Sequence, residues 1–404
     1  MSLILKMGFA NLFRHRRRSI LTGSAILLAV AITTFVQCYL RGLIDTMVYD
    51  FIRLQTGHVR LLHPDYQLKE RLFPLNLNVD EVEQRIEDLK KIPAVKQVAP
   101  RIRFGTLLSF GQTNQTGLGI GIVPQLETEI MRIEGDIRDG GSLKPGGMVI
   151  GAILAEKLGV KLGDEVTVLG QTQYHSIAAG LFEISGILTT GFEYIDRSTF
   201  FINFDEAQEM LDMENRASEL VVMGKAKEDV AGLLSALKQL SEPNDLTALS
   251  WLEQGGMGQM LRSTNASIVL LLGIVLFLAG LTITNTMLMS VLERTREIGT
   301  LKAIGMRPLR IVALFLCEGF YLGLLGSLGG TILGSAFALV LERTGIHIEG
   351  TLKNFSLPMA EVLYPHFYWE APLLALTFGT IVAMLASLVP AYKASRMLPR
   401  EAML

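Results

Sequence analysis

The chain has 404 residues, of which 50% are hydrophobic and only 19% are charged, and its formal net charge is −2. So apolar a composition excludes an ordinary soluble domain and predicts an integral membrane protein. We expect no nucleic-acid partner.

Four apolar segments are long enough to cross a bilayer, which takes about 20 helical residues. They are residues 19–40, 266–292, 311–341 and 371–392. Residues 41–265 alternate predicted strands with helices and are numerous enough to bury a core of their own. The predicted fold class is therefore a membrane protein with four transmembrane helices and a large extracytoplasmic α+β domain inserted between helices 1 and 2.

Residues 1–18 combine an apolar face with a basic cluster. Leu5, Phe9, Leu12 and Phe13 recur at helical spacing directly before a run of arginines. The pattern predicts a helix at the cytoplasmic interface of the membrane, with an ordinary positively charged flank as the alternative. The apolar segment that follows is too long for the core of a signal peptide, so we expect it to be retained as a membrane helix.

Lysine and arginine gather in three flanks of the membrane segments, and such residues favour the cytoplasmic side. These flanks are residues 1–18, the connection 293–310 and the tail 393–404. The connection 342–370 has only two basic residues and ends in an aromatic cluster typical of a bilayer interface. We therefore expect both termini in the cytoplasm, and residues 342–370 outside with the large domain.

Within residues 41–265 the local patterns predict a mixed set of elements. Strands are expected at 57–62, 117–123, 165–169, 182–188, 199–203 and 220–223. One helix is expected to open at a capping box formed by Asp80 and Glu83. Further helices are expected at 151–158, ended by Gly159, and at 227–240, closed by a breaker at 242–244.

The first membrane helix is expected to continue outward as an amphipathic stem. Its apolar residues recur at helical spacing: Leu40, Leu43, Ile44, Met47, Val48 and Phe51. Two interpretations remain open. Either this face packs against the second stalk, or a part of it made of Leu40, Leu43, Met47 and Phe51 lines a lipid-substrate cavity.

The charged connection 293–310 separates two long apolar segments and is short enough to form one helix and a turn. Its charges could make charge-assisted contacts in a cleft of a partner, with an ordinary solvated loop as the alternative. The candidate coupling residues are Glu293, Arg294, Arg296, Glu297, Gly299, Lys302, Gly305 and Arg307.

The third membrane segment carries a series of glycines: Gly319, Gly323, Gly326, Gly330 and Gly334. Small residues at such spacings let helix backbones approach closely, so we predict tight helix packing, within the chain or across a dimer. Glu318 lies inside the same segment, where an acid is costly unless it has a partner. We find no obvious intramembrane partner for it in the sequence, and a structural or interfacial role is favoured over proton coupling.

The sequence contains no pattern for a disulfide, a metal site or a catalytic site. The two cysteines, Cys38 and Cys317, lie in predicted membrane helices and belong to no ligand cluster, so we predict no disulfide and no metal. No phosphate-binding loop or catalytic constellation occurs. We expect a non-catalytic chain that binds no cofactor, with ATP and Mg²⁺ held by a separate partner ATPase.

At the level of whole motifs, the chain resembles the FtsX-like, MacB-type (type VII) permeases of ABC transporters. The run ERTREIGTLKAIGMRPLRI resembles the family's coupling segment, and PAYKASRMLPREAM, with Pro390 and Pro399, resembles its closing motif. VIGAILAEKLGVKLGDEVTV and FEISGIL resemble its extracytoplasmic domain, and FANLFRHRRRS its N-terminal entry. The resemblance implies that residues 293–310 form a coupling helix that docks on an ABC ATPase dimer.

Among these permeases the chain is most similar to the lipoprotein-releasing permeases of the LolC/LolE type, which FINFDEAQEML resembles. The resemblance implies extraction of lipoproteins from the bacterial inner membrane and their transfer to a periplasmic carrier. The candidate carrier-binding hairpin, with Gln171, Tyr174 and Ile177, is shorter than the family's hook.

Two other functions stay open: a MacB-like exporter of peptides or small molecules in a tripartite assembly, and an FtsX-like mechanotransmitting regulator of cell-wall hydrolases. A second permease is expected in each case, as a homodimer or a paralogous heterodimer.

Overall fold

The computed structural model describes residues 2–14, 16–225, 230–241, 246–347 and 362–397. The predicted breaker at 242–244, Pro399 of the closing motif and residues 348–361 of the connection 342–370 therefore lie outside the described residues. The chain forms two compact units. A helical unit takes in the chain up to Asp45, then Leu261–His347 and the chain from Val362, and an α+β unit takes in Thr46–Met260.

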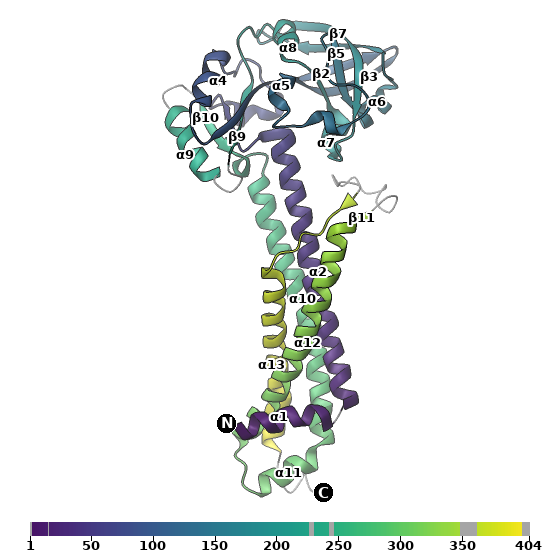
Figure 1. Ribbon diagram of the computed structural model, residues 1–404, viewed down its shortest axis with the longest axis vertical. Coiled ribbons are helices and arrows are strands. Elements are labelled where there is room, and N and C mark those ends of the chain that lie inside the picture. The colour runs from purple at the N-terminus through teal and green to yellow at the C-terminus, as the bar shows by residue number, and fades with distance from the viewer. Residues whose placement is uncertain (1, 15, 226–229, 242–245, 348–361, 398–404) are drawn as a thin grey trace. The chain divides into compact units, whose positions relative to one another are not determined.

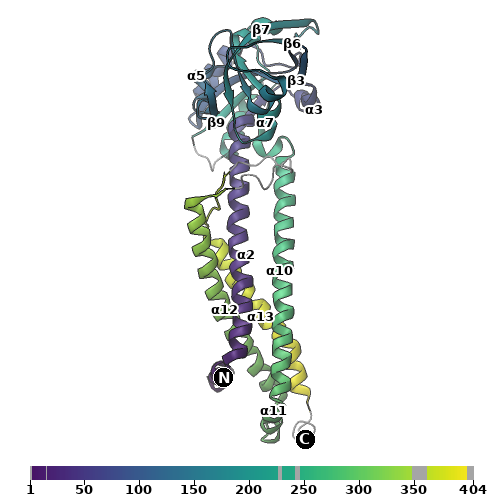
Figure 2. The same cartoon turned by 90° about the vertical axis from the view of Figure 1, so that its right-hand side faces the viewer.

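The helical unit is built from long apolar helices (Figures 1 and 2). Its elements are α1 (Ser2–Arg14), α2 (Arg16–Phe51), α10 (Met257–Glu293), α11 (Thr295–Ala303), α12 (Pro308–Thr344), α13 (Glu370–Arg396) and the short pair β11 (Ile346–His347) and β12 (Val362–Leu363). Among the described residues, α2, α10, α12 and α13 are long and apolar enough to cross a membrane. This confirms the four predicted membrane helices.

The glycines of α12 lie at two helix contacts. A Cβ on Gly323 would stand 2.6 Å from the Ala383 Cβ of α13, and Gly319 faces Ser387 of the same helix. Further along α12, Gly330 and Gly334 leave room for backbone oxygens of α2. Gly326 likewise faces α2. All five are buried, and the close helix packing seen at these positions is between helices of this chain.

Gly330→Val is expected to destabilise the helical unit, because its Cβ would lie 2.5 Å from the carbonyl oxygen of Leu27. Overpacking of this kind costs typically about 1–3 kcal/mol. The folded yield in detergent, measured by gel filtration and thermal unfolding, should fall. Gly273→Val on α10 is the control, because nothing lies within 4 Å of a Cβ there. Equal stability of the two variants would contradict the prediction.

The α+β unit contains a ten-stranded mixed sheet with the order β10-β1-β9-β2-β3-β8-β5-β7-β4, and β6 joins β2 to β7. Its strands are β1 (Val59–Leu62), β2 (Val95–Phe110), β3 (Thr113–Ile122), β4 (Ile137–Gly140), β5 (Gly147–Gly151), β6 (Glu165–Gln171), β7 (Ile177–Leu188), β8 (Thr199–Asn203), β9 (Glu219–Gly224) and β10 (Thr247–Ser250). Its main helices are α3 (Tyr66–Lys69), α4 (Val82–Lys90), α5 (Pro124–Glu127), α6 (Ala152–Leu158), α7 (Glu193–Ser198), α8 (Phe204–Leu211) and α9 (Val230–Ser241).

The strands β2, β3, β8, β5, β7 and β6 pair in turn and the circuit closes where β6 meets β2 at Leu107↔Leu169. Closure removes the exposed edges that an open sheet would present. One face of the circuit packs around Phe104 and Phe200, whose rings meet edge to face at 6.1 Å. Gly119 on β3 provides the space for Phe104, since a Cβ there would overlap the ring.

The strand β2 is the longest of the sheet and links the circuit to the β9-β1-β10 side. The sequence patterns did not predict it, because its burial is nearly continuous through its middle and offers no alternation to detect.

The predicted capping box at the start of α4 is wrong. The N-cap of α4 is Glu81 in the left-handed region without a side-chain cap, and Asp80 pairs with Arg85 at 2.7 Å. The predicted end of α6 is confirmed, since Gly159 has φ +79°.

Candidate functional site

The segment between α10 and α12 is the first candidate site, and α11 occupies its centre. The helix α10 ends at Glu293, α11 ends at Ala303, and α12 begins at Pro308. Gly305 has φ +93° in the turn after α11, a backbone conformation that side chains rarely adopt. The sequence therefore forms a short helix and a sharp turn, as expected for residues 293–310.

Arg294 and Glu318 form a buried ion pair within the helical unit. The Arg294 Nη1 lies 3.1 Å from Glu318 Oε2, and the side chains are 7% and 0% exposed. The guanidinium also lies over the ring of Phe315, 5.8 Å from its centroid. The structure thus supplies a partner for Glu318 that was not obvious in the sequence. Its partner is 24 residues away, at the turn between α10 and α11, and no local pattern reveals such a pair.

The pair extends into a line of alternating charges that joins three helices. Arg294 Nε lies 3.1 Å from Glu297 Oε2, and Arg14 Nη2 at the end of α1 lies 3.4 Å from Glu297 Oε1. Leu12 of α1 and Ile298 of α11 belong to the same apolar core below these charges. Only part of the predicted apolar face of α1 packs inside the protein, because Leu12 is buried whereas Phe9 and Phe13 are exposed.

The eight candidate coupling residues divide into two groups. Arg294 and Gly299 are buried, Glu297 and Lys302 are half-buried, and Lys302 Nζ donates to the Met397 carbonyl at 2.6 Å. The outward group is exposed: Glu293, Arg296, Gly305 and Arg307. Sequence reasoning missed Ile304 and Leu309, which are 81% and 80% exposed beside these charges. Exposed aliphatic side chains among arginines form a surface suited to a protein partner.

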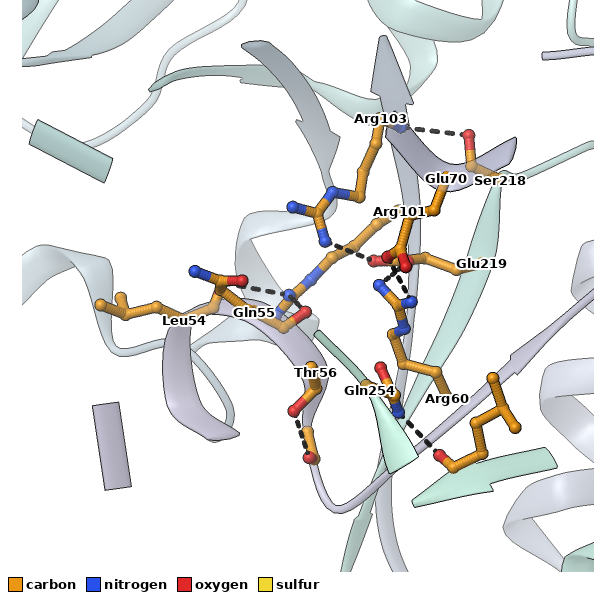
Figure 3. Close-up of polar contacts among 12 residues, drawn as sticks. Leu54, Gln55, Thr56, Arg60, Glu70, Arg101, Arg103, Ser218, Glu219 and Gln254 are labelled. Carbon is orange, nitrogen blue, oxygen red and sulfur yellow. Dashed lines mark hydrogen bonds and ion pairs between the residues drawn. The ribbon is translucent and has the colours of Figure 1, made fainter. Parts of the chain in front are cut away.

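The α+β unit contains a second charge cluster, which lies in its interior (Figure 3). Arg60 Nη1 lies 3.0 Å from Glu219 Oε2, and its Nη2 lies 2.6 Å from Glu70 Oε1. Arg103 Nη1 lies 3.8 Å from Glu219 Oε1. Burial raises the pKa of the neighbouring Tyr66 phenol, and the Glu219 carboxylate raises it further. Local sequence patterns do not reveal this cluster, because its members come from β1, β2 and β9 and from the residues after α3.

Arg101, also on β2, connects the sheet to the end of α2. Its Nε and Nη2 lie 2.6 and 2.9 Å from the two carboxylate oxygens of Glu127. Its Nη1 donates to the carbonyl oxygens of Gln55 at 3.1 Å and Leu54 at 3.4 Å (Figure 3). This fork geometry is the strong, orientation-specific form of an ion pair.

The hairpin of β6 and β7 is present, with Gln171↔Ile177 as its last pair. Its turn does not project freely. Gln173 is buried, accepts from Arg216 Nη1 at 2.7 Å and donates to the Asp212 carbonyl. Tyr174 lines a polar cleft of about 650 Å³ together with acidic residues of α8 and the residues after it. On the outer side of β7, Ile177 and Leu181 are 85% and 59% exposed.

The candidate lipid cavity receives no specific support. The helix α2 does continue to Phe51, so the predicted stem is confirmed. Phe51 is buried and packs beside Gly255, while Leu40, Leu43 and Met47 are half-buried.

Within the described ranges no group of three His, Cys, Asp or Glu could hold a metal ion.

Four helices that can cross a membrane, a domain inserted between α2 and α10 and a charged turn before α12 describe a polytopic membrane protein. Residues 19–240, more than half of the chain, match the MacB-like periplasmic core domain, and residues 269–399 match the FtsX-like permease C-terminal family. The chain belongs to the FtsX-like, MacB-type permeases of ABC transporters.

Three relatives indicate the range of functions in this family. The lipoprotein-releasing system transmembrane protein LolC of Xylella fastidiosa is 28% identical over 328 residues, which cover 77% of this chain and 78% of that protein. The corresponding LolE protein of Haemophilus influenzae is 24% identical and covers 78% of each chain. The macrolide export ATP-binding/permease protein MacB of Nitrobacter winogradskyi is 34% identical over 35% of this chain and 20% of that protein.

Proposed function

We propose that this chain is a permease subunit that uses ATP hydrolysis in a separate ATPase to extract lipoproteins from the bacterial inner membrane. The observation that carries the coupling part is the α11 segment, which is anchored by Arg294 and presents exposed Ile304 and Leu309. The lipoprotein part is supported by the LolC and LolE relatives, which match about three quarters of the chain.

In this proposal, both termini and α11 lie in the cytoplasm, and the α+β unit lies outside. The basic flanks support this orientation, since Lys and Arg favour the cytoplasmic side. ATP and Mg²⁺ are bound by the ATPase, and this chain binds neither. A second permease completes the assembly, and closure of the ATPase dimer moves α11 together with the helices to which it is anchored.

The function is tested by depleting the protein in its host and quantifying lipoproteins in separated inner and outer membranes. Retention of several lipoproteins in the inner membrane is the expected result. Normal sorting together with accumulation of a peptide or small molecule inside the cell would favour export instead. The MacB relative is the specific observation behind that second candidate.

Ile304→Asp is expected to separate ATP hydrolysis from transport. A buried aliphatic contact at the centre of an interface is worth about 2 kcal/mol or more, so affinity for the ATPase should fall about 30-fold. Co-purification and substrate-stimulated ATPase activity measure the effect. Leu68→Asp is the matched control, because Leu68 is similarly exposed, at 86%, on α3 of the α+β unit. An ATPase that binds the Ile304 variant normally would remove Ile304 from the docking surface.

We further propose that the apolar outer side of the β6–β7 hairpin is where a carrier receives the lipoprotein. Ile177 and Leu181 are both exposed on alternate positions of β7, so they share one face. Ile177→Asp is expected to leave ATP hydrolysis intact and to lower lipoprotein release to an added carrier. The same measurement on Leu68→Asp is the control. Unchanged release would exclude docking at this hairpin without affecting the coupling assignment.

A further inference from the structure

The two connections of the α+β unit to the membrane helices differ in kind. The α2 connection ends in the turn Ile52–Thr56, which is wound as a π-helix and accepts hydrogen bonds from the side chain of Arg101 on β2. The α10 connection begins after Gly255 and Gly256, whose φ angles are +56° and +71°. Glycine pairs in this region have wide backbone freedom, whereas a side-chain-clamped helix end does not.

We propose that Arg101 is a positioning residue that clamps the end of α2 to the sheet, so that the α+β unit follows α2, while Gly255–Gly256 allows α10 to swivel. This inference rests on the proposed transporter function, and it assigns to named residues the transmission of force from membrane helix to domain.

The proposed clamp acts on backbone carbonyl groups at the end of α2. The last carbonyl groups of a helix have no partner within it and carry partial negative charge, so a cation is stabilised there. In this turn Gly57 N–H donates to Ile52 O at 2.8 Å. The carbonyls of Leu54 and Gln55 accept from Arg101 Nη1 instead. A π-turn at this point fits the observation that such turns mark functional sites.

The guanidinium is itself held rigidly by Glu127. The two side chains are 1% and 3% exposed, and their bidentate contact satisfies both carboxylate oxygens. Glu127 ends α5, and Arg101 pairs in β2 with both β3 and β9. A displacement of the α2 end therefore reaches the longest strand of the sheet through the Arg101 side chain, which Glu127 holds in place.

A second contact restrains the rotation of the same helix end. Arg53 Nη1 lies 2.7 Å from Asp136 Oδ2 and donates to the Met131 carbonyl at 3.2 Å. Burial raises the pKa of Asp136, although the Arg53 charge opposes this shift. Behind the turn, a Cβ on Gly57 would overlap Val221 of β9, so the backbone passes the sheet at the closest distance that glycine allows. The end of α2 is thus contacted through Arg101, through Arg53 and at Gly57.

The test compares two variants in the full permease with its ATPase in nanodiscs. Arg101→Lys retains the positive charge but cannot make the bidentate contact with the Glu127 carboxylate. The double variant Arg101→Glu with Glu127→Arg retains a buried ion pair but removes the donor to Gln55 and Leu54. If Arg101 acts as the clamp, both variants hydrolyse ATP, and transport per ATP falls about tenfold, within the range by which single residues change coupling. If the pair were only structural, the double variant would recover normal transport per ATP.

A distance measurement provides a readout that does not involve the substrate. Spin labels are placed at Met47→Cys on α2 and Gln112→Cys in the β2–β3 turn, with Cys38 and Cys317 replaced by Ser. The distance between the two labels reports how firmly the end of α2 is held to the sheet. Both clamp variants should broaden the distance distribution. An unchanged, narrow distribution would overturn the clamp even if transport fell. Normal lipoprotein sorting in the depletion experiment would overturn only the substrate assignment.

Discussion

Replacing Glu318 by Gln is expected to abolish most transport and to lower the yield of folded permease. The substitution leaves the Arg294 guanidinium, which is 7% exposed, without its buried carboxylate. Breaking a buried ion pair by removing one partner costs about 3–5 kcal/mol, because the remaining charge is not compensated. Since Arg294 also holds Glu297, the anchoring of α11 should loosen at the same time.

The measurements are thermal unfolding in detergent and transport per ATP in liposomes. The charge-reversed double variant Arg294→Glu with Glu318→Arg should recover part of both, because it restores a pair of opposite charges. Glu370→Gln is the matched control, since Glu370 is an exposed acid in the first turn of α13. A Glu318→Gln protein with normal stability and normal coupling would show that the pair does not anchor α11.

Replacing Glu219 by Gln is expected to destabilise the α+β unit strongly without touching the coupling segment. Glu219 is 0% exposed and faces two guanidinium groups, those of Arg60 and Arg103. Removing its charge leaves an excess of buried positive charge, which costs about 3–5 kcal/mol. For a domain of this size, such a loss lowers the unfolding midpoint by roughly 6–20 °C.

Thermal unfolding of the full permease, followed by limited proteolysis of the α+β unit, measures this effect. Glu183→Gln on β7 is the control because its carboxylate is exposed. The ATPase should still bind the Glu219 variant at low temperature, since α11 is unchanged. A midpoint within 2 °C of the parent protein, roughly the limit for a change below 1 kcal/mol, would mean that Arg60 and Arg103 do not depend on Glu219.

Two buried ion pairs, Arg294–Glu318 and Arg101–Glu127, show why sequence reasoning did not predict these contacts. Glu318 and Arg294 were each noticed, one as a costly acid and the other as a coupling residue, but their contact depends on how α10 turns back into α12. Arg101 and Glu127 are 26 residues apart, and their role depends on carbonyls that lie 46 residues or more before Arg101. Local patterns contain no information on such pairs.

The four membrane helices, the inserted α+β unit and the charged turn around α11 were determined by the sequence alone. Their signals are local: apolar length, basic flanks and the positions of glycine. The tertiary structure decided the closed strand circuit through β6 and β2, the helix contacts made at the α12 glycines, and the hydrogen bonds from Arg101 to the carbonyls after α2. These features arise when distant segments pack together, because burial then forces each charge and each helix end to find a partner that its own segment does not supply.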